Sequence, residues 1–209
     1  MKPVETDELT IHYDAARCVH SRHCILGLPG VFLEGERPWI RPAGASTAAI
    51  VKAIEACPSG ALTYQRKDGA GEAAPAVNTI RVWENGPLEV RGDLRLGGRE
   101  MRRALLCRCG KTARPPFCDN SHRKGFGATG LPGFNEKKDH EPEGAGGPLV
   151  IEPEEHGSNR ITGNAEVIGS DGQRVARVKK AWFCRCGASG AKPFCDSSHK
   201  LIGFTKAVE

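Results

Sequence analysis

The sequence predicts an α+β protein in which a small mixed domain is followed by two β-rich modules of one kind. A block of sixteen residues occurs twice, at 107–122 and at 184–199, with ten identical positions and no insertion. Each block follows a strand-like stretch, RALLC before the first and VARVKKAWFC before the second. Ahead of residue 66, one helical pattern lies between two strand-like segments. A block repeated in this way indicates that one structural unit has been duplicated.

The N-terminal region is predicted to form a strand, a helix and a second strand. Residues 8–14 (ELTIHYD) carry apolar side chains at alternate positions, which is the pattern of a half-buried strand. Ser46 is expected to N-cap a helix over 47–56, because its hydroxyl can accept an unpaired N–H of the first turn. The helix should end at Cys57-Pro58, and residues 62–64 should return as a strand.

The duplication extends beyond the repeated block. Residues 80–83 (IRVW) and 87–92 (PLEVRG) are strand-like, and Asn85-Gly86 between them is a hairpin signal. Gly86-Pro87-Leu88 recurs as Gly147-Pro148-Leu149. Each module is therefore predicted to contain further strands ahead of the one that leads into its block.

A domain boundary is expected at residues 66–76, which are small, polar and contain Gly and Pro. The predicted domains are 1–66, which holds the mixed region, 77–127, which holds the first block, and 147–209, which holds the second.

Composition limits the class of protein. The chain has 209 residues, of which 39% are apolar and 26% charged, so it is a soluble chain long enough for two or three small domains. No apolar run approaches the roughly 18 residues of a membrane span, and the N-terminus has no hydrophobic signal region. We therefore expect a cytoplasmic protein without a membrane partner. The net charge of +5 is spread along the chain without a basic run, so nucleic-acid binding is not expected.

Each repeated block carries three thiols and one imidazole at matching positions. Such ligands suit zinc, copper or iron, so ligand type alone leaves the metal open. Structural zinc sites usually place two to four residues between paired cysteines, whereas one residue separates the pair here and eight precede the third thiol. A binuclear centre fits better, with the close pair on one iron and the distant Cys and His on the other; a zinc site is the alternative. The eight candidate ligands are Cys107, Cys109, Cys118 and His122, and Cys184, Cys186, Cys195 and His199.

Both blocks resemble the CDGSH iron–sulfur family, which includes mitoNEET and has the pattern C-x-C-x2-(S/T)-x3-P-x-C-D-G-(S/A/T)-H. The other pattern positions near the cluster are occupied by Thr112, Pro116 and Asp119 in the first block, and by Ser189, Pro193 and Asp196 in the second. Both blocks depart from the pattern at the glycine, which is Asn120 or Ser197. If that glycine needs a positive φ, Asn tolerates the conformation better than Ser does.

This resemblance implies one [2Fe–2S] cluster in each block, held by three Cys and one His. Family members with one motif per chain pair into dimers, so two motifs in one chain imply modules related by an intramolecular pseudo-twofold axis, and a monomer. We also expect Asp119 and Asp196 to N-cap a single helical turn that carries the histidine ligand.

The remaining thiols, Cys18, Cys24 and Cys57, form a third group. Nine cysteines would leave one over if paired in disulfides, whereas three metal clusters account for all of them. Buried core cysteines are the alternative for this group.

The segment that holds them resembles the divergent single-cluster ferredoxins, which use C-x2-C-x2-C and a distal C-P. Residues 57–61 (CPSGA) supply the distal half, but the middle position of the proximal half is Ser21. The resemblance implies a ferredoxin-like α+β domain with a [3Fe–4S] cluster on three thiolates. The other possibility is a [4Fe–4S] cluster whose last iron is held by Ser21, His20, His23 or water, and three irons are preferred.

These clusters favour a redox function. The leading hypothesis is a three-cluster protein that transfers electrons between partner proteins, with cluster transfer or redox and pH sensing as related roles. An N-terminal cluster held only by thiolates should have the lower potential, because histidine ligands raise the potential of an iron–sulfur centre. The sequence lacks the common hydrolase, dinucleotide and phosphate-loop motifs. An enzyme using the incompletely ligated N-terminal cluster, or a zinc-stapled binding module, are the alternatives.

Overall fold

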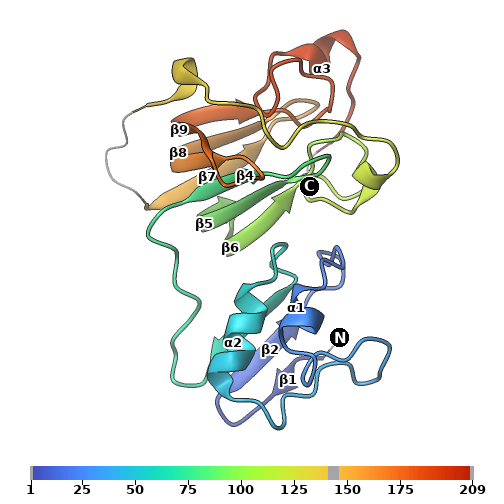
Figure 1. Cartoon of the computed structure of the whole chain (residues 1–209), viewed down its shortest axis with the longest axis vertical. Helices are drawn as coiled ribbons and strands as arrows, with labels where there is room; N and C mark the ends of the chain where they lie inside the picture. The colour runs from blue at the N-terminus through green and yellow to red at the C-terminus, as the bar shows by residue number, and fades with distance from the viewer. Residues whose placement is uncertain (1, 141–145, 208–209) are drawn as a thin grey trace. The chain divides into compact units, whose positions relative to one another are not determined.

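The computed structural model describes residues 2–140 and 146–207, so residue 1 of the first expected domain and residues 208–209 of the last lie outside it. The chain divides into two compact units, Met1–Ala73 and Ala74–Glu209. Most of the regular structure is strand, with few and short helices, so the fold is α+β (Figure 1). None of the helices in the described ranges is long and apolar enough to cross a membrane. The ranges given for three domains stay a prediction.

The first unit is a three-stranded antiparallel sheet with two helices. Its strands are β1 (Val4–Glu5), β2 (Leu9–Tyr13) and β3 (Leu62–Arg66), in the order β1-β2-β3, and its helices are α1 (His23–Gly27) and α2 (Thr47–Glu55). The predicted N-cap is confirmed, because the Ser46 hydroxyl accepts the N–H of Ala49 at 3.3 Å. Ile50 and Ile54 of α2 are buried in one core with Leu9 and Ile11 of β2.

The second unit is a six-stranded sheet built from two antiparallel three-stranded sets. Its strands are β4 (Thr79–Val82), β5 (Leu88–Leu96), β6 (Arg99–Leu106), β7 (Pro148–Pro153), β8 (Asn159–Ile168) and β9 (Arg174–Phe183). The first strand of each set pairs in parallel with the second strand of the other, β4 with β8 and β7 with β5. The strands β4, β5, β7 and β8 thus form a closed ring of pairings, a small barrel that β6 and β9 extend (Figure 1).

Both sets contribute to a single hydrophobic core. The inward-facing residues include Val90, Leu94 and Leu96 on β5, and Ile161, Ala165 and Val167 on β8. This alternation along each strand places one face of the sheet in the core. Because the parallel pairings and the core are shared, neither half has a complete sheet without the other.

Asn78 joins the two sets at the point where the chain enters β4. Its buried side-chain amide donates to the carbonyl oxygens of Gly147 and Asn164, at 2.9 and 2.8 Å. Its Oδ1 accepts the N–H of Asp93 at 3.2 Å. A Cβ at Gly92 would lie 2.2 Å from that oxygen, so a glycine is needed there. One side chain therefore ties together three segments that lie far apart in sequence.

Candidate metal centres

The first block begins where β6 ends, and its four candidate ligands lie in two pairs. The sulfur atoms of Cys107 and Cys109 are 3.6 Å apart. The Cys118 sulfur lies 3.3 Å from Nδ1 of His122. The carbonyl of Pro116 accepts the N–H of Cys107 at 2.8 Å, which holds the two parts of the block together.

The second block repeats this arrangement after β9. The Cys184 and Cys186 sulfur atoms are 3.8 Å apart, and the Cys195 sulfur lies 3.4 Å from Nδ1 of His199. The carbonyl of Pro193 accepts the N–H of Cys184 at 2.8 Å. In both blocks the cysteine pair begins in the protein core and the histidine is half-buried, so solvent reaches the imidazole side of each site.

Backbone N–H groups donate hydrogen bonds to the second and third cysteines of both blocks. In the first block, the N–H of Lys111 donates to the Cys109 sulfur at 3.5 Å and that of Asn120 to the Cys118 sulfur at 3.4 Å. In the second block, Ala188 donates to Cys186 and Ser197 to Cys195, both at 3.4 Å. Within each close pair, a hydrogen bond from the other thiol lowers the pKa of one member, Cys107 in the first block and Cys186 in the second, to about 6. The same contact and burial raise the pKa of the partner thiol, Cys109 or Cys184, and burial raises that of Cys118 and Cys195. One thiol in each block is therefore set to be anionic, the form that binds metal.

The predicted hydroxyl positions shape the loop between the close pair and the third cysteine. Thr112 donates to the carbonyl of Phe117 at 2.7 Å, and Ser189 donates to the carbonyl of Phe194 at 2.7 Å. Both side chains are buried, at 2% and 1% exposed, which explains why a small hydroxyl is needed at this position.

The prediction that Asp119 and Asp196 are N-caps is wrong by one residue. The helical turns are Ser121–Arg123, a 3₁₀ turn, and α3 (Ser198–Leu201), and the residues before them are Asn120 and Ser197. Each aspartate instead bridges two loops. Asp119 accepts the N–H groups of Ala113 and Ser121, and Asp196 accepts those of Gly190 and Ser198.

The two residues at the N-cap positions, Asn120 and Ser197, make no side-chain cap hydrogen bond, and their backbone is left-handed. Both Asn120 and Ser197 have a φ of 71°. This is the position where the CDGSH pattern has glycine, so the positive φ that a glycine would supply is adopted here by two other residues. For the serine in particular this backbone is uncommon.

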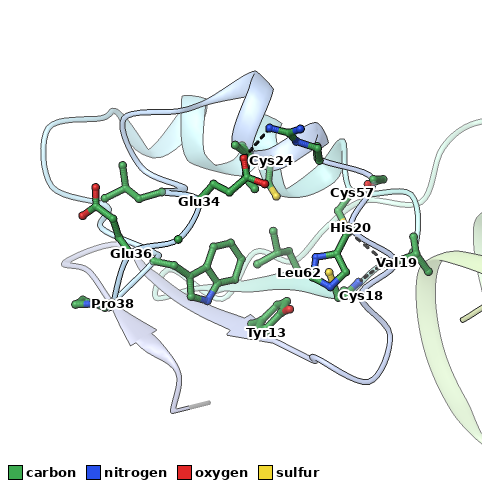
Figure 2. Close-up of a pocket in the computed structure, with 18 of the residues that line it drawn as sticks. Tyr13, Cys18, Val19, His20, Cys24, Glu34, Glu36, Pro38, Cys57 and Leu62 are labelled. Atoms are coloured by element: carbon green, nitrogen blue, oxygen red, sulfur yellow. Dashed lines mark hydrogen bonds and ion pairs between the residues drawn. The ribbon is translucent and has the colours of Figure 1, made fainter. Parts of the chain in front are cut away.

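The three N-terminal cysteines line one cavity of about 860 Å³ within the first unit (Figure 2). Cys18 precedes α1, Cys24 lies in α1 and Cys57 follows α2. Ser21, which occupies the expected position of a fourth ligand, also lines this cavity, as does His20. The fold thus brings together the thiols that sequence spacing grouped.

Each of these thiols has a hydrogen-bonding neighbour. Tyr13 is hydrogen-bonded to Cys18, and burial together with this contact raises the pKa of the phenol. A backbone hydrogen bond from Ile25 partly offsets the rise that burial causes in the pKa of Cys24. The Cys57 sulfur lies 3.5 Å from the Ser59 hydroxyl. Neither here nor in the two blocks do three or more His, Cys, Asp or Glu side chains of the described residues form a group that could hold a single metal ion.

Comparison with known families agrees with these sites. Residues 4–67 match the family described as "Divergent 4Fe-4S mono-cluster", and residues 85–123 and 156–200 match that described as "Iron-binding zinc finger CDGSH type". In its N-terminal region the chain is 38% identical over 61 residues to the "Uncharacterized protein YjdI" of Escherichia coli K12 and of E. coli O157:H7. That alignment covers 29% of this chain and 80% of YjdI. The chain belongs to both families. It is an iron–sulfur protein that joins a divergent single-cluster domain to two CDGSH segments.

Sequence reasoning missed a buried arginine in each CDGSH block. Arg108 and Arg185 are the residues between the two close cysteines, and each is 1% exposed. The guanidinium of Arg108 donates to the carbonyl oxygens of Gly86, Trp83, Thr129 and Ala128 at 2.9, 2.6, 3.0 and 3.1 Å. That of Arg185 donates to Gly157, Glu154 and Lys206 at 2.8, 2.6 and 3.1 Å. The sequence feature that could have indicated these arginines is the Cys-Arg-Cys motif, which both blocks share.

These arginines connect the two CDGSH sites electrostatically. Burial lowers the pKa of each guanidinium, and a cysteine of the other block opposes the shift, Cys184 for Arg108 and Cys107 for Arg185. The loops also touch. A Cβ at Gly110 would lie 2.5 Å from the Cys186 carbonyl oxygen, and one at Gly187 would lie 2.8 Å from that of Cys109. The ligand loops of the two blocks in this CDGSH protein therefore pack against each other.

Proposed function

We propose that the protein is an electron carrier with three iron–sulfur clusters. Each CDGSH block would hold one [2Fe–2S] cluster through three cysteines and one histidine. The third cluster would lie at Cys18, Cys24 and Cys57. Three irons were preferred there from the sequence, but the family description supports the four-iron alternative, which we adopt.

The observation that carries this proposal is the pairing of the ligands. Two atoms bound to one tetrahedral metal at bond lengths of about 2.3 Å lie about 3.8 Å apart. The Sγ–Sγ distances of 3.6 and 3.8 Å, and the Sγ–Nδ1 distances of 3.3 and 3.4 Å, are close to this value. Two pairs per block match the two irons of a [2Fe–2S] cluster, whereas one zinc ion would draw all four atoms to a single centre.

Reciprocal contacts between the modules support a pseudo-twofold arrangement and a monomer. The β4–β8 and β7–β5 pairings are equivalent, and so are the Gly110–Cys186 and Gly187–Cys109 contacts. Each module thus finds in the same chain a strand that completes its sheet. The contact between the ligand loops also brings the two proposed cluster sites together, which supports electron exchange between them before a redox partner protein accepts the electrons.

A reductive titration tests the electron-carrier role. All three clusters are expected to be reduced and reoxidised reversibly while the protein keeps its iron and sulfide, since fixed protein ligands hold both oxidation states. Visible absorbance and electron paramagnetic resonance (EPR) spectra would follow each step under anaerobic conditions. Loss of iron at the first reduction would instead support cluster transfer, and centres that accept no electron would refute the proposal.

The half-buried histidines predict that the two [2Fe–2S] clusters are sensitive to acid. Protons compete with iron for an imidazole nitrogen, so lowering the pH should detach His122 and His199. Replacing both by cysteine should let the visible absorbance of these clusters persist to lower pH, which stopped-flow spectroscopy would measure. An unchanged rate of acid bleaching would contradict a proton-sensitive role for these ligands.

A further inference from the structure

The N-terminal cavity lacks a fourth thiol. Cys18, Cys24 and Cys57 supply three sulfur donors, and Ser21 stands where a fourth cysteine is expected. The family that matches this region is described by a four-iron cluster. A cubic cluster offers four irons to the protein, so one iron needs another ligand or stays open to solvent.

The structure narrows the candidates for that ligand. His20 and Ser21 line the cavity, whereas His23, the first residue of α1, is not among its lining residues in the described part of the chain. Figure 2 shows His20 at the end of the cavity that carries Cys18 and Cys57. The cavity therefore contains one imidazole, that of His20, and the hydroxyl of Ser21 in the same loop. Its other oxygen-bearing side chains already have partners: Tyr13 and Ser59 contact Cys18 and Cys57, and Glu34 and Glu36 form ion pairs with arginines.

The backbone of the cysteine loop indicates which of the two is positioned for binding. His20 has a φ of 51° and Arg22 a φ of 65°. A non-glycine residue rarely adopts this left-handed conformation and keeps it where the surroundings require it, which happens often at binding sites. Arg22 forms an ion pair with Glu34 at 2.6 Å, on the cavity side of the loop. His20 forms no such ion pair in the described residues, so its imidazole is available to a metal in the cavity that it lines.

Ligand chemistry favours the histidine over the serine. A neutral imidazole suits iron, whereas a serine hydroxyl is a hard donor that must lose a poorly acidic proton to bind. We propose that His20 supplies the fourth ligand, which gives the N-terminal domain a [4Fe–4S] cluster with three thiolates and one imidazole. This inference rests on the cluster proposed at the three cysteines. A histidine ligand would raise the reduction potential of this cluster, so the difference from the two [2Fe–2S] clusters would be smaller than an all-thiolate ligand set predicts.

Three single substitutions in the full chain test the assignment. One equivalent of ferricyanide accepts one electron from the cluster, and an iron without a protein ligand then leaves as Fe²⁺. His20→Ala should yield a three-iron EPR signal and lose about one iron per chain after this treatment. Ser21→Ala and the matched control His23→Ala should keep the four-iron spectrum. A His20→Ala protein that keeps all its iron, or a three-iron signal produced by Ser21→Ala alone, would overturn the proposal.

A direct spectroscopic signature does not depend on iron loss. In a chain with His122→Cys and His199→Cys, pulsed EPR of the reduced N-terminal cluster should show coupling to an imidazole nitrogen, and adding His20→Ala should remove it. If His20→Ala does not fold, His20→Cys provides the second variant. It should keep four irons and lower the potential of this cluster, because a thiolate adds negative charge. An unchanged potential would contradict ligation by His20.

The experiments distinguish a failure of the His20 assignment from a failure of the cluster proposed at the three cysteines. If the wild-type protein shows no iron cluster at Cys18, Cys24 and Cys57, the proposed function fails for the N-terminal domain. If that cluster is present and the His20 variants leave its spectrum and potential unchanged, only the assignment of His20 fails.

Discussion

Replacement of Cys57 by alanine is expected to abolish the N-terminal cluster while leaving the spectra of both [2Fe–2S] clusters intact. Cys57 is 7% exposed and supplies one of three thiols in the cavity, so its loss would leave two sulfur donors for a cluster that needs more. The EPR signal of the reduced four-iron cluster should disappear completely, and iron per chain should fall by the content of one cluster. EPR and chemical iron analysis on the same sample measure both effects.

Ser59→Ala is the matched control for this prediction. It removes the hydroxyl that lies 3.5 Å from the Cys57 sulfur and leaves the sulfur itself in place. The cluster should remain, with a lower potential because one hydrogen bond to a ligand sulfur is lost. If Cys57→Ala retained the N-terminal signal, the cavity would not be the cluster site.

Arg108→Ala is expected to be strongly destabilising, by about 3–5 kcal/mol, because it removes a buried charge and leaves four carbonyl oxygens without their donor. The guanidinium also lies 5.4 Å from the centre of the Phe126 ring, so a cation–π contact is lost as well. Guanidinium chloride unfolding followed by circular dichroism, with the clusters bound, would measure the shift in midpoint.

The second module provides an internal comparison. Arg185→Ala should cost less than Arg108→Ala, because Arg185 donates to three carbonyl oxygens and its Nη1 has no hydrogen-bond partner among the described residues. Arg99→Ala, at an exposed position of β6, is the control and should change stability by no more than about 0.5 kcal/mol. Equal effects of Arg108→Ala and Arg99→Ala would show that the buried hydrogen bonds do not stabilise the fold.

Much of the local structure could be predicted because it depends on neighbouring residues. The cap at Ser46, the strands and the grouping of thiols all follow from periodicity, side-chain chemistry and spacing. The need for a positive φ at Asn120 and Ser197 followed from comparing the blocks with a glycine-containing pattern. The aspartates were placed one residue wrong as N-caps because the capping position is decided by backbone conformation rather than by side-chain type.

The features that were missed depend on contacts between distant segments. Periodicity identified each strand, but nothing in one strand indicates that β4 pairs with β8 and β7 with β5. In the same way, Asn78 and Arg108 are ordinary polar residues in sequence. Their importance appears only when folding buries them against carbonyl oxygens that lie about 20 or more residues away.

Anaerobic determination of metal and acid-labile sulfide per chain tests the central claim most directly. Two binuclear clusters and one four-iron cluster predict about eight iron atoms and about eight sulfides, and a brown protein. A folded, colourless protein that carries only zinc, or no metal and no sulfide, would contradict the account.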